Sequence, residues 1–213
     1  MGPDVNSVSA TLVLLVRHGL TPTTGQVLPG RAPGLHLSEA GRAQAETAAE
    51  RIAGLPVTAV YTSPLERTRE TAAPIARRFG LEVQVDAGLL ECEFGEWTGR
   101  KISELATLPE WRTVQKKPSE FRFPGGESFE EMSDRVLAAL FAQARRHCGE
   151  VIVCVSHADP LKAAIAHLDG RDLDGFQSVV VDPASISVAE FTAAGDTRMR
   201  SCNTTSGEVG IRR

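Results

Sequence analysis

Aromatic residues, cysteine pairs and long apolar runs are all scarce in this sequence, and each shortage argues against a class of protein. Phe, Trp and Tyr make up 5% of the 213 residues, and no basic run is interleaved with them. The formal net charge of -4 does not favour contact with nucleic acid or an acidic membrane surface. No apolar stretch approaches the roughly 18 residues that a membrane-spanning helix needs. We therefore expect neither nucleic acid nor a membrane among the partners.

The cysteines show no C-x-x-C pair and no zinc-ligand spacing, so they are typical of unpaired thiols in a reducing compartment. They are Cys92, Cys148, Cys154 and Cys202. The first ten residues lack the basic start and apolar core of a signal peptide. We therefore expect a cytoplasmic protein.

The sequence does have the composition of a globular domain, with 42% hydrophobic and 23% charged residues. Its length suits one domain with a sizeable core. Residues 1–10 are small and polar. We expect them to form a flexible tail ahead of a single domain over residues 11–213.

The stretch from Thr11 to Gly19 organises the chain, because an aliphatic run leads directly into Arg17, His18 and Gly19. A short apolar run without alternation is typical of a strand buried on both faces of a parallel sheet. Open α/β sheets bind ligands at the carboxyl edge of such strands. Taken alone, the motif fits an ordinary strand meeting a polar turn equally well.

Two later strands also end in polar residues. Residues 57–62 form one strand, after which we expect Ser63 as N-cap, Pro64 as first helical residue and Glu66 as capping-box partner. This geometry would hold Arg67 in the first helical turn. Residues 151–156 form the other strand, which ends at His157.

Strands and helices alternate along the chain, which predicts an α/β fold: a three-layer α/β/α sandwich around a central, mostly parallel sheet. We expect helices from Ser38 to Gly54, from Ser63 through Pro74 to Gly80, near residues 102–105, from the Ser128–Glu131 capping box to Gly149, and after Asp159-Pro160. Further strands are expected over residues 81–85, 186–191 and 198–202, the last two as a hairpin turning at Gly195-Asp196.

The three strand ends would bring two arginines and two histidines to one edge of the sheet: Arg17 with His18, then Arg67, then His157. In an acidic protein they make a local positive pocket. One guanidinium group can bind two phosphoryl oxygens at once, and a neutral imidazole can act as a nucleophile at physiological pH. The constellation therefore points to phosphoryl chemistry.

Five ordered motifs make this more specific: Arg17-His18-Gly19, residues 63–68 (SPLERT), Glu91 ahead of residues 94–97 (FGEW), residues 124–128 (PGGES), and Ser156-His157. Together, over roughly residues 11–190, they resemble the histidine phosphatase superfamily, the phosphoglycerate-mutase-like proteins. The resemblance is to the small bacterial phosphatase branch that includes α-ribazole phosphatase and probable phosphomutases.

The resemblance implies that His18 is the nucleophile and becomes a phosphohistidine, while Arg17, Arg67 and His157 bind the phosphoryl oxygens. It also implies that no metal and no other cofactor is needed. Glu91 would donate a proton to the leaving oxygen and later take one from water. Glu93 and Glu96 stand close to Glu91 in the sequence and remain alternatives for this role.

Four further residues are candidates for substrate or phosphate binding. Gly19 would let the backbone approach the phosphate, because it has no Cβ. Thr24 and Ala158 stand where many relatives have Asn and Gly, and we expect them to affect substrate fit. Arg31, in the proline- and glycine-rich loop of residues 20–37, either contacts substrate or is a surface charge. The remaining histidines, His36, His147 and His167, are expected to be structural or exposed.

These features predict a metal-independent phosphomonoesterase of the histidine acid phosphatase type, acting on a small phosphorylated metabolite. One alternative is a phosphoglycerate-type mutase, although only about 30 residues separate Trp97 from Ser128, where the mutases carry a longer insertion. The other is a phosphate-ligand or protein-binding module with a decayed site, which complete retention of the site residues argues against. A homodimer is left open.

Overall fold

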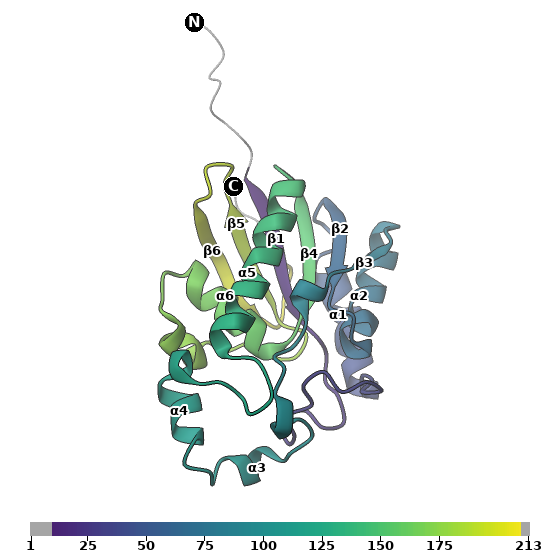
Figure 1. The fold of residues 1–213 in the computed structure, drawn as a ribbon. Helices are drawn as coiled ribbons and strands as arrows, with labels where there is room; N and C mark the ends of the chain where they lie inside the picture. The colour runs from purple at the N-terminus through teal and green to yellow at the C-terminus, as the bar shows by residue number, and fades with distance from the viewer. Residues whose placement is uncertain (1–9, 210–213) are drawn as a thin grey trace, which may run out of the picture.

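A six-stranded mixed sheet lies at the centre of the computed structural model, which describes residues 10–209 (Figure 1). Strands β3 (Val83–Val85), β2 (Val57–Thr62), β4 (Val151–Ser156) and β1 (Thr11–Arg17) are parallel. At the other edge, β5 (Ile186–Phe191) and β6 (Thr197–Thr204) form an antiparallel hairpin on β1. The prediction of a mostly parallel sheet and a C-terminal hairpin is confirmed.

Two layers of helices cover the sheet (Figure 1). Helices α1 (Glu39–Arg51) and α2 (Glu66–Phe79) pack together on one face, and α5 (Phe129–Arg146) and α6 (Ala158–Leu168) pack on the other. The short helices α3 (Ile102–Leu105) and α4 (Trp111–Lys116) lie beyond the carboxyl edge of the sheet. Short 3-10 helices lie at Ala87–Leu89, Gly95–Trp97, Pro118–Glu120 and Leu173–Ser178. The predicted three-layer sandwich is thus confirmed.

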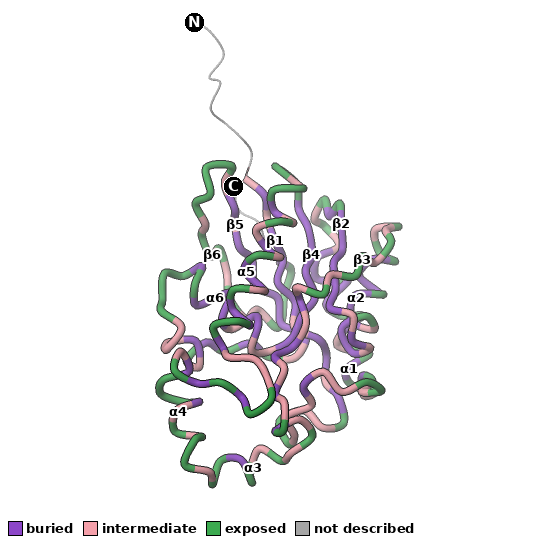
Figure 2. Tube along the Cα trace, viewed as in Figure 1, coloured by how far each residue is buried: buried purple, intermediate pink, exposed green. Residues whose placement is uncertain are grey.

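Strand β1 is buried on both faces, as its continuous apolar run predicts. Val13 and Leu15 pack into the core shared with α5 and α6, whereas Leu14 and Val16 pack into the core shared with α1 and α2. All four are at most 1% exposed. Each such side chain contributes roughly 1.5–3 kcal/mol relative to an exposed one. Figure 2 shows this burial along the central strands.

The register of the parallel strands positions the polar strand ends. Arg17 on β1 lies opposite Ser156 on β4, and the His18 amide donates to the Ser156 carbonyl at 3.0 Å. The Ser63 amide donates to the Val155 carbonyl at 3.0 Å from the other side of β4. The residues that follow β1, β2 and β4 therefore emerge next to one another.

Helix-capping predictions succeeded at two helices and failed at a third. Ser38 caps α1 and Ser128 forms a capping box with Glu131 at α5. The expected cap at Ser63 is wrong: α2 begins at Glu66 behind Leu65, which makes no side-chain cap bond. The Ser63 hydroxyl instead lies 2.8 Å from His157 Nε2, and the Glu66 carboxylate accepts from the Gly34 amide. These tertiary partners outweighed the local capping signal.

Other helix and strand boundaries differ from the predicted ones by a few residues. Helices α1 and α5 end at Arg51 and Arg146, before the predicted glycines, and β3 is shorter than residues 81–85. The sequence did not predict α4. The predicted tail of residues 1–10 lies outside the described residues apart from Ala10, as do residues 210–213. Between residues 10 and 209, no helix combines the length and apolarity needed to cross a membrane.

Two long loops meet beyond the carboxyl edge of the sheet. The Leu28 amide donates to the Arg100 carbonyl at 3.0 Å, and the Ile102 amide donates to the Gln26 carbonyl at 2.9 Å. Most of the few aromatic side chains of the protein pack behind this junction, in a cluster of Phe94, Trp97, Trp111, Phe121, Phe123, Phe129 and Phe176. This apolar cluster fixes the loops against α5 and above the strand ends.

Candidate active site

The predicted nucleophile His18 and the three predicted phosphoryl-binding residues, Arg17, Arg67 and His157, meet at the carboxyl edge of the sheet. His157 and Arg67 are fully buried and His18 is 6% exposed. The imidazole rings of His18 and His157 lie edge to face, with 5.3 Å between their centroids. Burial lowers the pKa of both histidines, and the positive charges of Arg67 and Arg17 lower it further. The sequence prediction that these side chains converge is therefore correct.

His18 is held as a neutral imidazole. Its Nδ1 lies 2.7 Å from the Gly19 carbonyl, which can only accept, so Nδ1 carries the proton. The lone pair then resides on Nε2. Burial, followed by the charge of Arg67, lowers the pKa of His18 to about 3. At neutral pH the ring is therefore uncharged and has the lone pair that a nucleophile requires.

His157 is held in the opposite orientation. Its Nε2 lies 2.8 Å from the Ser63 hydroxyl, which itself accepts a long 3.5 Å bond from the Leu65 amide. If Ser63 donates to Nε2, the proton of His157 resides on Nδ1. Burial and Arg67 hold the pKa of His157 well below its usual value. With Ser63 as the donor, His157 offers a neutral N–H at Nδ1, and its contact with Ser63 was not predicted from the sequence.

Several donors in the site are buried with no protein partner among residues 10–209. They are Arg67 Nε and Nη1, Arg17 Nε and His157 Nδ1. The other guanidinium nitrogens are anchored, since Arg67 Nη2 donates to the Gly30 carbonyl at 2.8 Å and Arg17 Nη1 to the Val181 carbonyl at 2.7 Å. Burial lowers the pKa of both guanidinium groups, but such groups stay charged in proteins. Buried donors without partners are costly, and an anion would satisfy them.

Glu91 is the carboxyl group beside these donors. Its Oε1 accepts from the Cys92 amide at 2.9 Å, and its Oε2 lies 4.0 Å from His157 Nδ1. Burial, reinforced by the charge of Asp159, raises the pKa of Glu91 to about 7. A carboxyl group that titrates near neutral pH can both donate and accept a proton. Glu96 is exposed, and Glu93 is half-buried and lies 3.7 Å from Arg31 Nη1.

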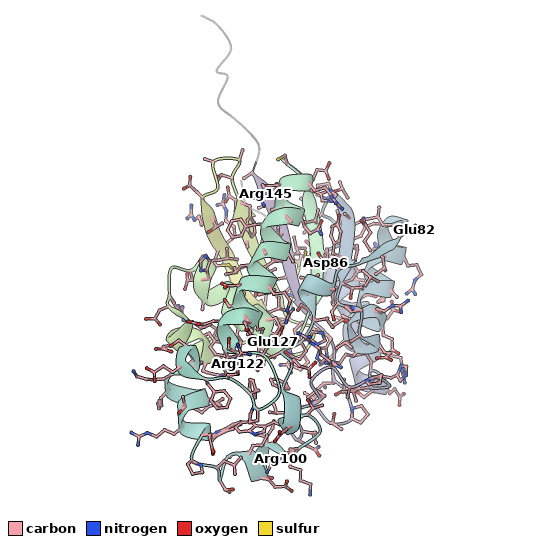
Figure 3. The ribbon with its side chains drawn as sticks, in the orientation of Figure 1. Glu82, Asp86, Arg100, Arg122, Glu127 and Arg145 are labelled. Carbon is pink, nitrogen blue, oxygen red and sulfur yellow. The ribbon has the colours of Figure 1, made fainter. Side chains whose placement is uncertain are left out.

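Two arginines hold the backbone carbonyl of Glu91. Arg31 Nε donates to it at 2.8 Å and Arg135 Nη2 at 3.3 Å. Arg135 also donates to the carbonyls of Gly88 and Leu90, and both arginines contact the carboxylate of Glu127. Figure 3 labels Glu127, which precedes Ser128, the N-cap of α5. Arg31 therefore has protein partners that help to position Glu91, which the sequence did not predict, and its contact with substrate stays a prediction.

A cleft of about 220 Å³ opens onto His18 and Glu91. Its wall combines apolar side chains with threonine hydroxyl groups and the charged side chains of Arg17, Asp159 and Lys162. The other lining residues are Thr21, Thr23, Thr24, Gly25, Val27, Leu28, Pro29, Phe94, Ile102 and Ala158. Asp159 and Lys162 were not singled out from the sequence. Arg67 and His157 are fully buried and are not part of this lining.

Three predicted binding residues have specific local environments. The Thr24 hydroxyl lies 2.9 Å from both the Thr21 amide and the Thr21 hydroxyl, so it braces the loop as well as lining the cleft. Ala158 lines the cleft as the first residue of α6. A Cβ on Gly19 would lie 2.5 Å from the Gly41 carbonyl, so close packing on α1 already requires glycine there.

The residues set aside on sequence lie outside the cleft. His36 contacts Glu70 and is exposed, His147 Nε2 lies 2.8 Å from the Tyr61 hydroxyl, and His167 is exposed. Burial raises the pKa of the Cys92 thiol, which keeps it protonated. In the described part of the chain, no three His, Cys, Asp or Glu side chains are grouped as metal ligands.

A three-layer domain with paired histidines, paired arginines and a carboxyl group at one sheet edge is the arrangement that the sequence motifs suggested for a histidine phosphatase. Residues 13–205 match the histidine phosphatase superfamily (branch 1), and the chain belongs to that superfamily.

Its relatives are phosphatases and mutase-like proteins. Phosphoserine phosphatase 1 of Hydrogenobacter thermophilus is 35% identical over 181 residues, which cover 83% of this chain and 84% of that protein. A probable phosphoglycerate mutase of Salmonella choleraesuis is 34% identical over 160 residues, or 74% of each chain.

Two solved structures have the same fold over nearly their whole length. A mycobacterial glucosyl-3-phosphoglycerate phosphatase is 25% identical with a TM-score of 0.81, covering 92% of this chain and 99% of that one. A putative α-ribazole-5'-P phosphatase from Escherichia coli is 26% identical with a TM-score of 0.82, covering 95% and 100%.

Proposed function

We propose that this chain is a phosphomonoester hydrolase that transfers the phosphoryl group of a small metabolite first to His18 and then to water. The observation that carries the proposal is the state of His18. Its Nδ1 proton is fixed on the Gly19 carbonyl, its ring is neutral, and buried donors without protein partners surround it. The phosphatases among the relatives support the same reading.

In the first step the Nε2 lone pair of His18 forms a bond to phosphorus, and the ester P–O bond breaks. The leaving oxygen takes the proton of the Glu91 carboxylic acid. Arg17, Arg67 and the Nδ1–H of His157 donate to the remaining phosphoryl oxygens and neutralise their charge. The Gly19 carbonyl accepts from the Nδ1–H of His18 and so stabilises the positive charge that develops on the ring.

In the second step the Glu91 carboxylate takes a proton from a water molecule whose oxygen forms a bond to phosphorus. The P–N bond breaks, its electron pair returns to His18 Nε2, and inorganic phosphate leaves. Glu91 ends the cycle protonated again. Its pKa of about 7 suits both halves of the cycle, because neither protonation state is strongly favoured at neutral pH.

We propose that the reaction needs no metal ion and no other cofactor. In many phosphoryl-transfer enzymes a metal neutralises the charge on the phosphoryl oxygens. Here Arg17 and Arg67 would supply that charge from buried positions. The cytoplasmic location stays a prediction from the sequence.

A phosphoglycerate-type mutase is the second candidate, because a probable phosphoglycerate mutase is among the relatives. A mutase has to keep the phosphoenzyme from water until the phosphoryl group is returned. The short segment between Trp97 and Ser128 favours hydrolysis, since it holds only α3, α4 and a 3-10 turn.

A panel of phosphorylated metabolites distinguishes the candidates. The purified protein should release inorganic phosphate from at least one alkyl ester, with undiminished rate in the presence of a chelator. With 3-phosphoglycerate and 2,3-bisphosphoglycerate it should isomerise weakly at most. Isomerisation without phosphate release would establish the mutase. Phosphate binding without turnover of any ester would indicate a phosphate-binding module in place of an enzyme. Loss of activity on chelation would contradict metal independence.

A further inference from the structure

The cleft carries one ion pair that the proposed reaction does not use. Asp159 and Lys162 lie three residues apart near the start of α6, and both line the cleft beside His18 and Glu91. Their side chains are 19% and 22% exposed, and Lys162 Nζ lies 3.7 Å from Asp159 Oδ1. This separation is an ionic contact but exceeds the length of a hydrogen bond.

The Lys162 ammonium group has N–H donors that are not used, whereas the negative charge of Asp159 is already compensated by two cations. An ammonium group has three N–H donors, and the Asp159 contact is the single ion pair that Lys162 makes among the described residues. Burial lowers the pKa of Arg17, and the charges of Glu91 and then Asp159 raise it, so Asp159 also interacts with a second cation of the cleft lining. An additional anion in the cleft would therefore find its free partner at Lys162.

The rest of the lining shows which part of a substrate would reach Lys162. The phosphoryl group would occupy the buried donors of Arg17, Arg67 and His157. The alcohol part would then lie in the open cleft, against a wall of aliphatic side chains, Phe94 and threonine hydroxyls. Along that lining, within residues 10–209, Lys162 is the cation left for a group other than the phosphate.

We propose that Lys162 is a specificity-determining residue that binds a carboxylate on the alcohol part of the substrate. The substrate class is then a small phosphorylated hydroxy acid, since a cleft of about 220 Å³ is smaller than the roughly 300–1,000 Å³ of sites for drug-sized ligands. This inference rests on the proposed function, because it assumes that the phosphoryl group is held beside His18.

Two pairs of esters measure the effect of the substrate carboxylate. O-phosphoserine and phosphoethanolamine differ in the carboxylate alone, and 3-phosphoglycerate and glycerol 3-phosphate differ by a carboxylate in place of a hydroxymethyl group. For each pair, the ratio of kcat/KM for the acid to kcat/KM for its partner is measured by phosphate release. The wild-type protein should prefer the acid. In Lys162→Met, which keeps the aliphatic stem, the ratio should fall roughly 10- to 100-fold, as expected for loss of a charge-assisted hydrogen bond.

Lys162→Arg keeps the charge and should restore most of the preference. Lys101→Met is the matched control: Lys101 Nζ lies 3.9 Å from Glu104 Oε1, also three residues along a helix start, but its side chain is 69% exposed and outside the cleft lining. Its ratio should match the wild type. An unchanged ratio in Lys162→Met, an equal fall in Lys101→Met, or a wild-type preference for phosphoethanolamine would each overturn the proposal.

Binding of phosphonates keeps this test independent of turnover. 3-Phosphonopropionate carries a carboxylate where propylphosphonate carries a methyl group, and neither can be hydrolysed. Calorimetry should show tighter binding of the acid to the wild-type protein and loss of that preference in Lys162→Met. If calorimetry shows this preference while no ester is hydrolysed, the proposed function is wrong and the carboxylate site at Lys162 is supported. If esters are hydrolysed but neither measurement shows a Lys162-dependent preference, the subsite fails and the proposed function stands.

Discussion

The neighbouring rings of His18 and His157, with centroids 5.3 Å apart, present opposite nitrogens to the site. His18 commits Nδ1 to the Gly19 carbonyl, and His157 commits Nε2 to the Ser63 hydroxyl. The first arrangement leaves a lone pair on Nε2, and the second, with the Ser63 hydroxyl as donor, leaves an N–H on Nδ1. Both rings are neutral because they are buried beside Arg67. In the proposed mechanism these two identical side chains have different tasks, His18 as nucleophile and His157 as donor.

The two shifted pKa values predict the pH dependence of kcat/KM. His18 reacts only when neutral, so activity should rise with pH through its lowered pKa of about 3. Glu91 donates only when protonated, so activity on an alkyl phosphate should fall as pH rises through its raised pKa of about 7. In Glu91→Gln the fall near pH 7 should disappear. The substrate ionises in the same way with both proteins. If kcat/KM of Glu91→Gln still falls near pH 7, the fall is due to the substrate or to another group of the protein, and not to Glu91.

Leaving-group chemistry tests Glu91 as the acid. An alkoxide needs a proton in the transition state, whereas a nitrophenolate leaves without one. Glu91→Gln should therefore slow phosphoenzyme formation from an alkyl phosphate by about 10²- to 10⁴-fold more than from p-nitrophenyl phosphate in a single turnover. Glu93→Gln and Glu96→Gln serve as controls. Equal slowing of both substrates would mean that Glu91 positions groups rather than donating a proton.

Arg135 should act on the reaction through Glu91. Arg135→Met removes hydrogen bonds to the carbonyls of Gly88, Leu90 and Glu91, and leaves the Glu127 carboxylate without its bidentate partner. We expect kcat on alkyl phosphates to fall roughly 10- to 100-fold, because small misplacements of a catalytic group are costly. The rate with p-nitrophenyl phosphate should fall much less.

The control for this prediction is Arg145→Met, an exposed position on the same helix. If Arg135→Met lowers the rates on both substrates equally, with a matching loss of thermal stability, Arg135 supports the fold and does not specifically position Glu91.

Local signals in the sequence were sufficient for the framework of the site. The apolar runs of β1, β2 and β4 predict buried parallel strands, and parallel strands bring their carboxyl ends to one edge. The convergence of Arg17, His18, Arg67 and His157 follows from that geometry. Glu91 was identified from its motif, and its burial distinguishes it from Glu93 and Glu96.

Contacts between distant segments could not be predicted in the same way. Ser63 has the local features of a helix cap, but its hydroxyl contacts a histidine 94 residues away. Arg135 and Lys162 are ordinary helical cations in the sequence, and their roles depend on which helix face meets the cleft or the Glu91 loop. The wall formed by Leu28 and Ile102 depends on pairing between two irregular loops.

Trapping the covalent intermediate tests the central claim most directly. The protein is mixed with ester labelled in its phosphoryl group, quenched within the first turnover, and digested to locate the label. His18→Ala and His167→Ala, the second at an exposed histidine, are treated identically. We expect an acid-labile, base-stable adduct on His18. The adduct and turnover should both be absent in His18→Ala and both be retained in His167→Ala. Label on a serine, or undiminished turnover in His18→Ala, would contradict the central claim.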